Sequence, residues 1–280
     1  NDDNYSDFYI KERESVVRPL IAEFCNKEFG ISVKYKPLIQ FWKNWLDSHI
    51  EKSSDILVAR EENELLKKVV IAKGIFLEIL AGERQAEELL QREETSPEFW
   101  SLNGEDTKYF LDKFLPDKVH DKKIAVLGAR TGEIIKQYWN LFDQAEEITL
   151  FDNSAGILKL AQEKLAKIET NVHYCSSYNN GIEESEVNKY DIVLAVNYLH
   201  INEDPLNEVK WAALLLKEEG EFYAIEYEKF DPMGILISGL LENGFVNRKK
   251  GRGVCTPLLS LDEWKVIYKQ SRFEKVVIER

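Results

Sequence analysis

The first hundred residues carry apolar side chains at spacings of three and four, the period of an amphipathic helix. Strand-like alternation of apolar and polar residues is missing from this part of the sequence. The pattern predicts helices over residues 15–28, 37–51, 61–80 and 83–92. The N-terminal third of the chain is therefore expected to be entirely helical.

From Lys122 onward, short runs rich in β-branched residues alternate with helical stretches. The runs predict strands over residues 124–127, 148–151, 172–174, 190–196, 221–225 and 274–278. Between and after them, helices are expected over residues 133–142, 155–167, 206–217 and 261–270, with one more ending near Asn243. Such alternation is typical of a parallel, doubly wound sheet. We expect an α/β fold with a mostly parallel sheet of seven strands, the last one antiparallel, and helices on both faces.

A polar stretch with a proline, residues 94–97, separates the two patterns. It predicts a helical subdomain over residues 1–95 and an α/β core over residues 96–280. We expect the helical subdomain to form a lid over the carboxyl ends of the strands.

The composition argues against several kinds of partner and site. A net charge of −13 opposes binding to a phosphate backbone, so nucleic acid is not expected as a partner. No apolar stretch approaches the roughly 20 residues that span a bilayer, and no secretory segment opens the chain, so we expect a cytoplasmic protein without membrane contact. The three cysteines form no CxxC pair, and neither a disulfide framework nor a metal site is expected.

Ligands of open α/β sheets bind outside the carboxyl ends of the strands. The first expected strand ends in the turn Gly128-Ala129-Arg130-Thr131-Gly132, and a helix follows. A GxxxG turn of this kind is explained equally well by local structure alone. The second strand ends in Asp152 and Asn153, and a carboxylate there can accept hydrogen bonds from both hydroxyls of a ribose. The alternative role of Asp152 is that of a helix N-cap.

The fourth and fifth expected strands each end in a group that can take part in proton transfer. His200 follows the fourth, and Glu226 lies at the end of the fifth. A histidine oriented by a carboxylate can act as a general base. The alternative is that His200 is an ordinary polar residue at the rim of the sheet.

Several segments together resemble the C-methyltransferase-type domains of modular polyketide synthases, which have the class I S-adenosylmethionine methyltransferase fold. The resemblance runs from about Lys67 to the C-terminus. Its markers are residues 76–83, 88–90, the glycine turn 128–132, and residues 151–154, 190–200, 214–220 and 256–264.

This resemblance implies a function. The family's cofactor is S-adenosylmethionine, and its substrate is a β-ketoacyl chain on an acyl carrier protein. A His and Glu pair removes a proton from the carbon between the two carbonyls, and His200 and Glu226 stand at the matching positions. It further implies flanking polyketide synthase domains as partners. The expected cofactor-binding residues are Gly128, Ala129, Gly132, Asp152 and Asn153.

Three departures fall on the cofactor side of this resemblance. Val126 stands where the family has an acid, and Arg130 replaces the middle glycine of the turn. Ser176 and Ser177 stand where the family presents an aspartate to the adenine. We therefore expect a pseudo-methyltransferase with a degraded cofactor site that binds no cofactor. The alternative reading of the departures has Arg130 pointing to solvent and a serine hydroxyl replacing the aspartate.

The runner-up function is an active C-methyltransferase, which would use S-adenosylmethionine. A free-standing methyltransferase for small molecules or nucleic acids is disfavoured by the lack of a basic face. A nicotinamide-dependent dehydrogenase is disfavoured because the spacing of the glycine turn is not GxGxxG.

Overall fold

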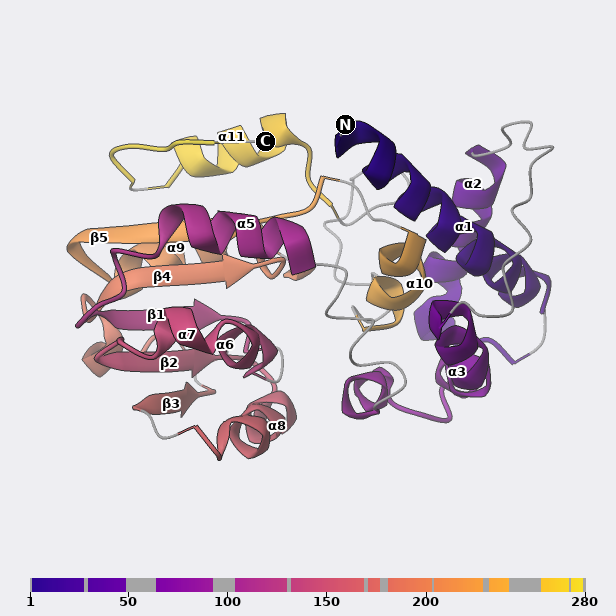
Figure 1. Cartoon of the computed structure of the whole chain (residues 1–280), viewed down its shortest axis with the longest axis horizontal. Coiled ribbons are helices and arrows are strands. Elements are labelled where there is room, and N and C mark those ends of the chain that lie inside the picture. Colours follow the sequence, from indigo (N-terminus) through magenta and orange to yellow (C-terminus); the bar gives the residue numbers. More distant parts are fainter. Residues whose placement is uncertain are drawn as a thin grey trace. The chain divides into compact units, whose positions relative to one another are not determined.

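The chain forms two compact units in a computed structural model (Figure 1). The structure describes residues 2–27, 30–48, 64–92, 104–129, 132–168, 171–176, 181–202, 204–228, 232–241, 258–271 and 273–278. One unit, here the helical unit, comprises Asn1–Leu102 and Lys229–Pro257. The other, the sheet unit, comprises Asn103–Glu228 and Leu258–Arg280. The helical unit thus includes a second segment, Lys229–Pro257, which was expected in the α/β core.

The sheet unit is built on five parallel strands in the order β3-β2-β1-β4-β5, which Figure 1 shows from bottom to top. The strands are β1 (Lys123–Leu127), β2 (Glu147–Phe151), β3 (Val172–Cys175), β4 (Tyr190–Val196) and β5 (Leu216–Ile225). Their order reverses between β1 and β4, as in doubly wound folds. Side chains of β1 and β4 are buried on both faces, which explains why these strands read as continuous apolar runs. The predicted α/β fold is confirmed.

Helices cover both faces of this sheet, and each face has its own apolar cluster. One cluster contains side chains from α5 (Gly104–Phe114), α6 (Glu133–Gln137), α7 (Trp139–Phe142) and α8 (Ala155–Leu165). The other contains side chains from α9 (Pro205–Leu215) and α11 (Leu261–Lys269). The expected helix over residues 133–142 is divided in two at Tyr138, which leaves the helical conformation.

The helical unit has an apolar core of its own. Its elements are α1 (Asp2–Asn26), a 3-10 turn η1 (Val33–Tyr35), α2 (Lys36–Ser48), α3 (Glu64–Ala81), a 3-10 segment η2 (Ala86–Gln91) and α10 (Pro232–Leu241). In α10 every side chain up to Leu240 is buried, as expected for a helix that is apolar on all sides. Trp42 of α2 donates a hydrogen bond from Nε1 to the carbonyl of Ile235, at 2.7 Å. This packing explains why α10 belongs to the N-terminal helices.

The predicted antiparallel strand over residues 274–278 was wrong. These residues have an irregular conformation, and Val276, Val277 and Ile278 are 42%, 68% and 39% exposed. Their β-branched composition predicted a strand, but a strand also requires a neighbour for its ladder. The sheet therefore has five strands among the described residues, instead of the expected seven.

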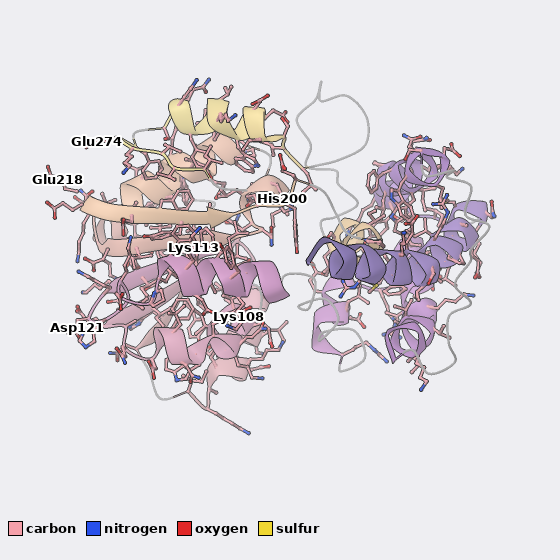
Figure 2. All side chains as sticks on the ribbon, turned by 45° about the horizontal axis from the view of Figure 1, so that its top comes forward. Lys108, Lys113, Asp121, His200, Glu218 and Glu274 are labelled. Atoms are coloured by element: carbon pink, nitrogen blue, oxygen red, sulfur yellow. The ribbon has the colours of Figure 1, made fainter. Side chains whose placement is uncertain are left out.

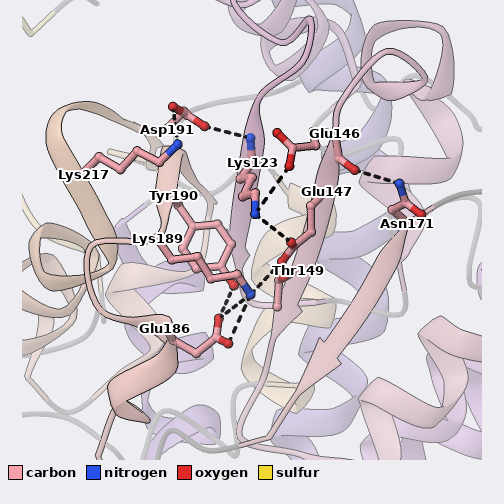
Figure 3. Close-up of polar contacts among 10 residues, drawn as sticks. All are labelled: Lys123, Glu146, Glu147, Thr149, Asn171, Glu186, Lys189, Tyr190, Asp191 and Lys217. Atoms are coloured by element: carbon pink, nitrogen blue, oxygen red, sulfur yellow. Dashed lines mark hydrogen bonds and ion pairs between the residues drawn. The ribbon is translucent and has the colours of Figure 1, made fainter.

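A polar network joins the amino ends of the strands (Figure 3). Lys189, just before β4, lies 2.7 Å from Glu147 at the start of β2. Asp191 accepts a hydrogen bond from the backbone N–H of Lys123 at 3.0 Å and pairs with Lys217 at 2.8 Å. These contacts tie the four neighbouring strands β2, β1, β4 and β5 together at the end of the sheet away from the candidate site.

No helix among the described residues is long and apolar enough to cross a membrane. The expected lid over the carboxyl ends of the strands stays a prediction, because it concerns the placement of one unit relative to the other.

Candidate active site at the carboxyl ends of the strands

The glycine turn after β1 adopts a backbone that only glycine takes without strain. Gly128 and Gly132 have φ angles of +78° and +73°. A Cβ on Gly132 would lie 2.7 Å from Cδ1 of Leu165, so α8 packs directly against this glycine. A Cβ on Gly128 would lie 2.3 Å from Cδ2 of Tyr198. The backbone conformation and the close packing within the sheet unit are therefore enough to explain why both positions are glycine.

Asp152 ties the end of β2 to the glycine turn. Its Oδ2 accepts a hydrogen bond from the backbone N–H of Ala129 at 3.1 Å, and its Oδ1 accepts one from Ser154 at 2.9 Å. The N-cap of α8 is Ser154, whose hydroxyl accepts a hydrogen bond from Ile157 at 3.3 Å. Asp152 is thus not the N-cap, and each of its oxygens already has a backbone donor. The neighbouring Asn153 is exposed.

The positions that depart from the family pattern have different surroundings. Val126 is 2% exposed and lies in an apolar cluster, with Leu150 of β2 and Leu194 of β4 as its register partners. Ser176 is exposed just after β3. Arg130 and Ser177 lie outside the described residues, so the effects of the departures at these two positions stay predictions.

The end of β4 turns sharply at Asn197. This residue is 1% exposed and has a φ angle of +48°, a left-handed conformation that asparagine tolerates better than most residues. Its backbone N–H donates a hydrogen bond to the carbonyl of Ile225 at 2.7 Å, which extends the pairing of β4 with β5 by one step. The turn directs the following 3-10 segment η6 (Leu199–Ile201) toward the end of β5.

The structure brings His200 and Glu226 together. Nδ1 of His200 lies 2.5 Å from Oε2 of Glu226, and their side chains are 1% and 6% exposed. Oε1 of Glu226 accepts hydrogen bonds from the backbone N–H groups of Tyr198 at 3.0 Å and Leu199 at 2.7 Å. In Figure 2, His200 lies at the opposite end of the sheet from Asp121 and Glu218.

This arrangement has a definite chemical capability. The two backbone donors fix the Glu226 carboxylate, which in turn orients the imidazole. A neutral histidine that directs its Nδ1 hydrogen at a carboxylate presents Nε2 as its proton acceptor. A pair with this geometry can act as a general base.

Other titratable groups of the sheet unit were not foreseen from the sequence. Burial and the negative charge of Glu226 raise the pKa of Tyr268 on α11. Burial and the nearby Asp204 raise the pKa of Glu208 on α9 to about 7. Neither residue belongs to a recognisable motif. Asn197 did carry a signal, since asparagine directly after a strand is typical of a left-handed turn.

The remaining histidines lie elsewhere. His120 pairs with Asp121 on the surface at 2.9 Å. His173 is exposed on β3, and His49 lies outside the described residues.

Comparison with known proteins finds polyketide synthases among the sequence relatives. A stretch of 160 residues, 55% of this chain, is 28% identical to the highly reducing polyketide synthase GPY1 of Gibberella fujikuroi. A stretch of 157 residues is 30% identical to the hybrid PKS-NRPS synthetase phm1 of a Pyrenochaetopsis species. The matches span only 6% and 4% of the lengths of these relatives. No family model matches the chain.

Solved structures share the fold over almost the whole chain. The CMeT domain of the citrinin polyketide synthase aligns with a TM-score of 0.69 and 16% identity, over 92% of this chain and 82% of that domain. The trans-methyltransferase CalH, solved in complex with SAH, aligns with a TM-score of 0.71 and 16% identity, over 96% of this chain and 85% of its own. The chain thus has the fold of the carbon-methyltransferase domains of polyketide synthases.

Proposed function

We propose that this chain is a pseudo-methyltransferase domain of a polyketide synthase, without catalytic activity and with a structural role between flanking domains. Its S-adenosylmethionine site has lost the contacts that hold the cofactor. The resemblance to polyketide synthase domains supports the setting, and the surroundings of the cofactor-side residues support the loss.

The observation that carries this proposal is the burial of Val126. The family places an acid at this position to engage the ammonium group of the methionine moiety. Val126 is 2% exposed within an apolar cluster, so the end of β1 offers an aliphatic side chain in place of a carboxylate. A cationic ammonium group gains nothing from such a neighbour and loses its hydration.

The other cofactor-side groups fit the ligand no better. Asp152 holds the glycine turn through Oδ2, at 3.1 Å from the Ala129 N–H, and the start of α8 through Oδ1, at 2.9 Å from the Ser154 N–H. Each carboxylate oxygen still has a second lone pair for a ribose hydroxyl. Ser176 provides a neutral group where the family has an aspartate. Losing one charge-assisted hydrogen bond costs roughly 1.5–3 kcal/mol, so two such losses weaken binding about a thousandfold. A micromolar site becomes a millimolar one.

The second candidate function is an active C-methyltransferase, and the geometry of His200 and Glu226 favours it. In that case Nε2 of His200 takes the proton from the carbon between the two carbonyls, and Glu226 stabilises the resulting imidazolium. The distance of 2.5 Å between Nδ1 and Oε2 supports this role. The pair can also persist as a structural contact, because Glu226 fixes the backbone after β4.

The partners follow from the same setting. The sequence relatives are multidomain synthases whose lengths far exceed this chain, so we propose flanking synthase domains as its contacts. An acyl carrier protein belongs to both candidate functions. If the domain is active, the acyl carrier protein delivers the β-ketoacyl substrate to it. If the domain is inactive, the substrate on the acyl carrier protein is not methylated.

A methylation assay separates the two functions. The intact chain is incubated with S-adenosylmethionine and a β-ketoacyl substrate on an acyl carrier protein, and the mass of the product is measured by mass spectrometry. We expect no gain of a methyl group, and the same result for His200→Ala. Methylation by the unaltered chain that His200→Ala abolishes would establish the active enzyme instead.

A repaired variant tests the stated cause of the loss. Val126→Asp combined with Arg130→Gly restores the family's residues at two positions. Because residue 126 is buried, the new carboxylate destabilises the sheet unit until a cation neutralises it. S-adenosylmethionine should therefore raise the melting temperature of the repaired variant and leave that of the unaltered chain unchanged. Equal shifts in both proteins would contradict the assigned cause.

A further inference from the structure

The ring of Tyr198 lies directly on the backbone of the glycine turn. A Cβ on Gly128 would be 2.3 Å from Cδ2, 2.7 Å from Cγ and 3.0 Å from Cε2 of this ring. No real Cβ comes so near to another side chain, so Gly128 is required for the contact. Tyr198 is 4% exposed. One side chain thus joins the ends of the neighbouring strands β1 and β4.

The main chain of the same residue holds the Glu226 carboxylate. The Tyr198 N–H donates to Oε1 of Glu226 at 3.0 Å, and the Tyr198 carbonyl accepts a hydrogen bond from Nδ2 of Asn202 at 2.9 Å. His200 follows two residues later, at 2.5 Å from the other oxygen of the same carboxylate. Tyr198 therefore contacts the glycine turn with its ring and the His200–Glu226 pair with its backbone.

We propose that Tyr198 is a positioning residue that couples the glycine turn to the His200–Glu226 pair. In a densely packed site the Tyr198 ring cannot move independently of its neighbours. If Gly128 is displaced, the ring must move with it, and so must the Tyr198 backbone that follows β4. A change at the turn alters the orientation of the imidazole. This inference goes beyond the proposed function, since it holds whether or not the site binds S-adenosylmethionine.

Nuclear magnetic resonance of the histidine rings measures this coupling without catalysis. The chain has four histidines, and His200→Gln identifies the Cε1–Hε1 signal of His200 by its loss. Gly128→Ala should shift this signal, because the new methyl group displaces the Tyr198 ring. Tyr198→Ala should shift it as well, whereas Tyr198→Phe, which keeps the ring, should leave it in place.

A double-mutant cycle isolates the role of the ring. In the Tyr198→Ala background, Gly128→Ala should cause no further shift of the His200 signal, although the backbone strain at residue 128 is the same. Gly132→Ala is the matched control, since Gly132 is also left-handed but its Cβ would meet Leu165 of α8. It should leave the His200 signal unchanged.

Three outcomes would overturn the inference. They are an unmoved His200 signal in Gly128→Ala, a Gly128→Ala shift that persists without the ring, and an equal shift in Gly132→Ala. Should Gly128→Ala fail to fold, the comparison of Tyr198→Ala with Tyr198→Phe decides, and equal His200 signals in these two variants would reject the role of the ring.

Discussion

The Glu226 carboxylate has contacts with three successive residues of the chain. Its Oε1 accepts from the N–H groups of Tyr198 and Leu199, and its Oε2 faces His200. Buried donors without an acceptor cost free energy, so this one side chain organises the whole turn after β4. The contacts that orient His200 therefore also stabilise the fold.

Replacing Glu226 tests this structural role. Glu226→Ala leaves two backbone N–H groups without an acceptor, at about 1–3 kcal/mol each. We expect a loss of about 3 kcal/mol in the free energy of unfolding, measured by urea denaturation. Glu226→Gln keeps a carbonyl oxygen for both donors and should lose about 1 kcal/mol. Equal losses in the two variants would show that the backbone contacts contribute little.

Glu208 gives the sheet unit a specific pH dependence. This side chain is 8% exposed, and its Oε2 has no hydrogen-bond partner among the described residues. Burial raises its pKa from 4.5 to about 7, so the folded state holds the proton more tightly than the unfolded state. The cost of this group is therefore absent below pH 4.5, grows as the pH rises, and is complete above pH 7.

Glu208→Gln should remove that cost. From the difference between 4.5 and about 7, the variant should be more stable than the unaltered chain by on the order of 3 kcal/mol at pH 8. At pH 4.5 the two proteins should differ little. Glu218→Gln, the same change at an exposed position of β5, serves as the control. A gain that is equal at both pH values would contradict the assigned cause.

Among the helices and strands, the pattern of apolar residues predicted an element best where its side chains are buried. The bounds of β1, β2, β3 and β4 were predicted to within one residue. β5 begins at Leu216, five residues before the predicted strand, because its first half is largely exposed and carries no apolar run. Residues 274–278 were wrongly predicted, since β-branched residues on a surface look the same in sequence. The expected helix over residues 83–92 is instead the 3-10 segment η2, which the apolar spacing does not distinguish from an α-helix.

Two helix glycines make a matched test of packing between elements. A Cβ on Gly239 of α10 would lie 2.1 Å from Cδ1 of Leu38 on α2, whereas a Cβ on Gly74 of α3 would meet nothing within 4 Å. Alanine improves helix propensity at both positions by about 1 kcal/mol. We expect Gly74→Ala to stabilise by about that amount and Gly239→Ala to destabilise by about 1–3 kcal/mol.

Thermal or urea unfolding of the two glycine variants gives the answer. A stabilising Gly239→Ala would mean that α10 and α2 separate easily, and that the helical unit is held by other contacts.

At the scale of the whole molecule, the two ends of the sheet have different roles. The amino ends carry a network of ion pairs (Figure 3). The carboxyl ends carry His200, which Figure 2 labels, together with Asp152 and Glu226. The rule for open α/β sheets predicted the second set from the sequence. The ring of Tyr198 on Gly128 was beyond prediction, because a contact between two strand ends leaves no local pattern. The segment Lys229–Pro257 was likewise assigned by sequence order, whereas packing places α10 with α1 and α2.

A domain that has lost its cofactor contacts should not bind S-adenosylmethionine. Isothermal titration of S-adenosylmethionine into the unaltered chain measures this, with a cofactor-binding domain of the same fold as the positive control. We expect no measurable heat of binding at micromolar concentrations, because Val126 offers no partner to the ammonium group. A micromolar dissociation constant would instead favour an active C-methyltransferase.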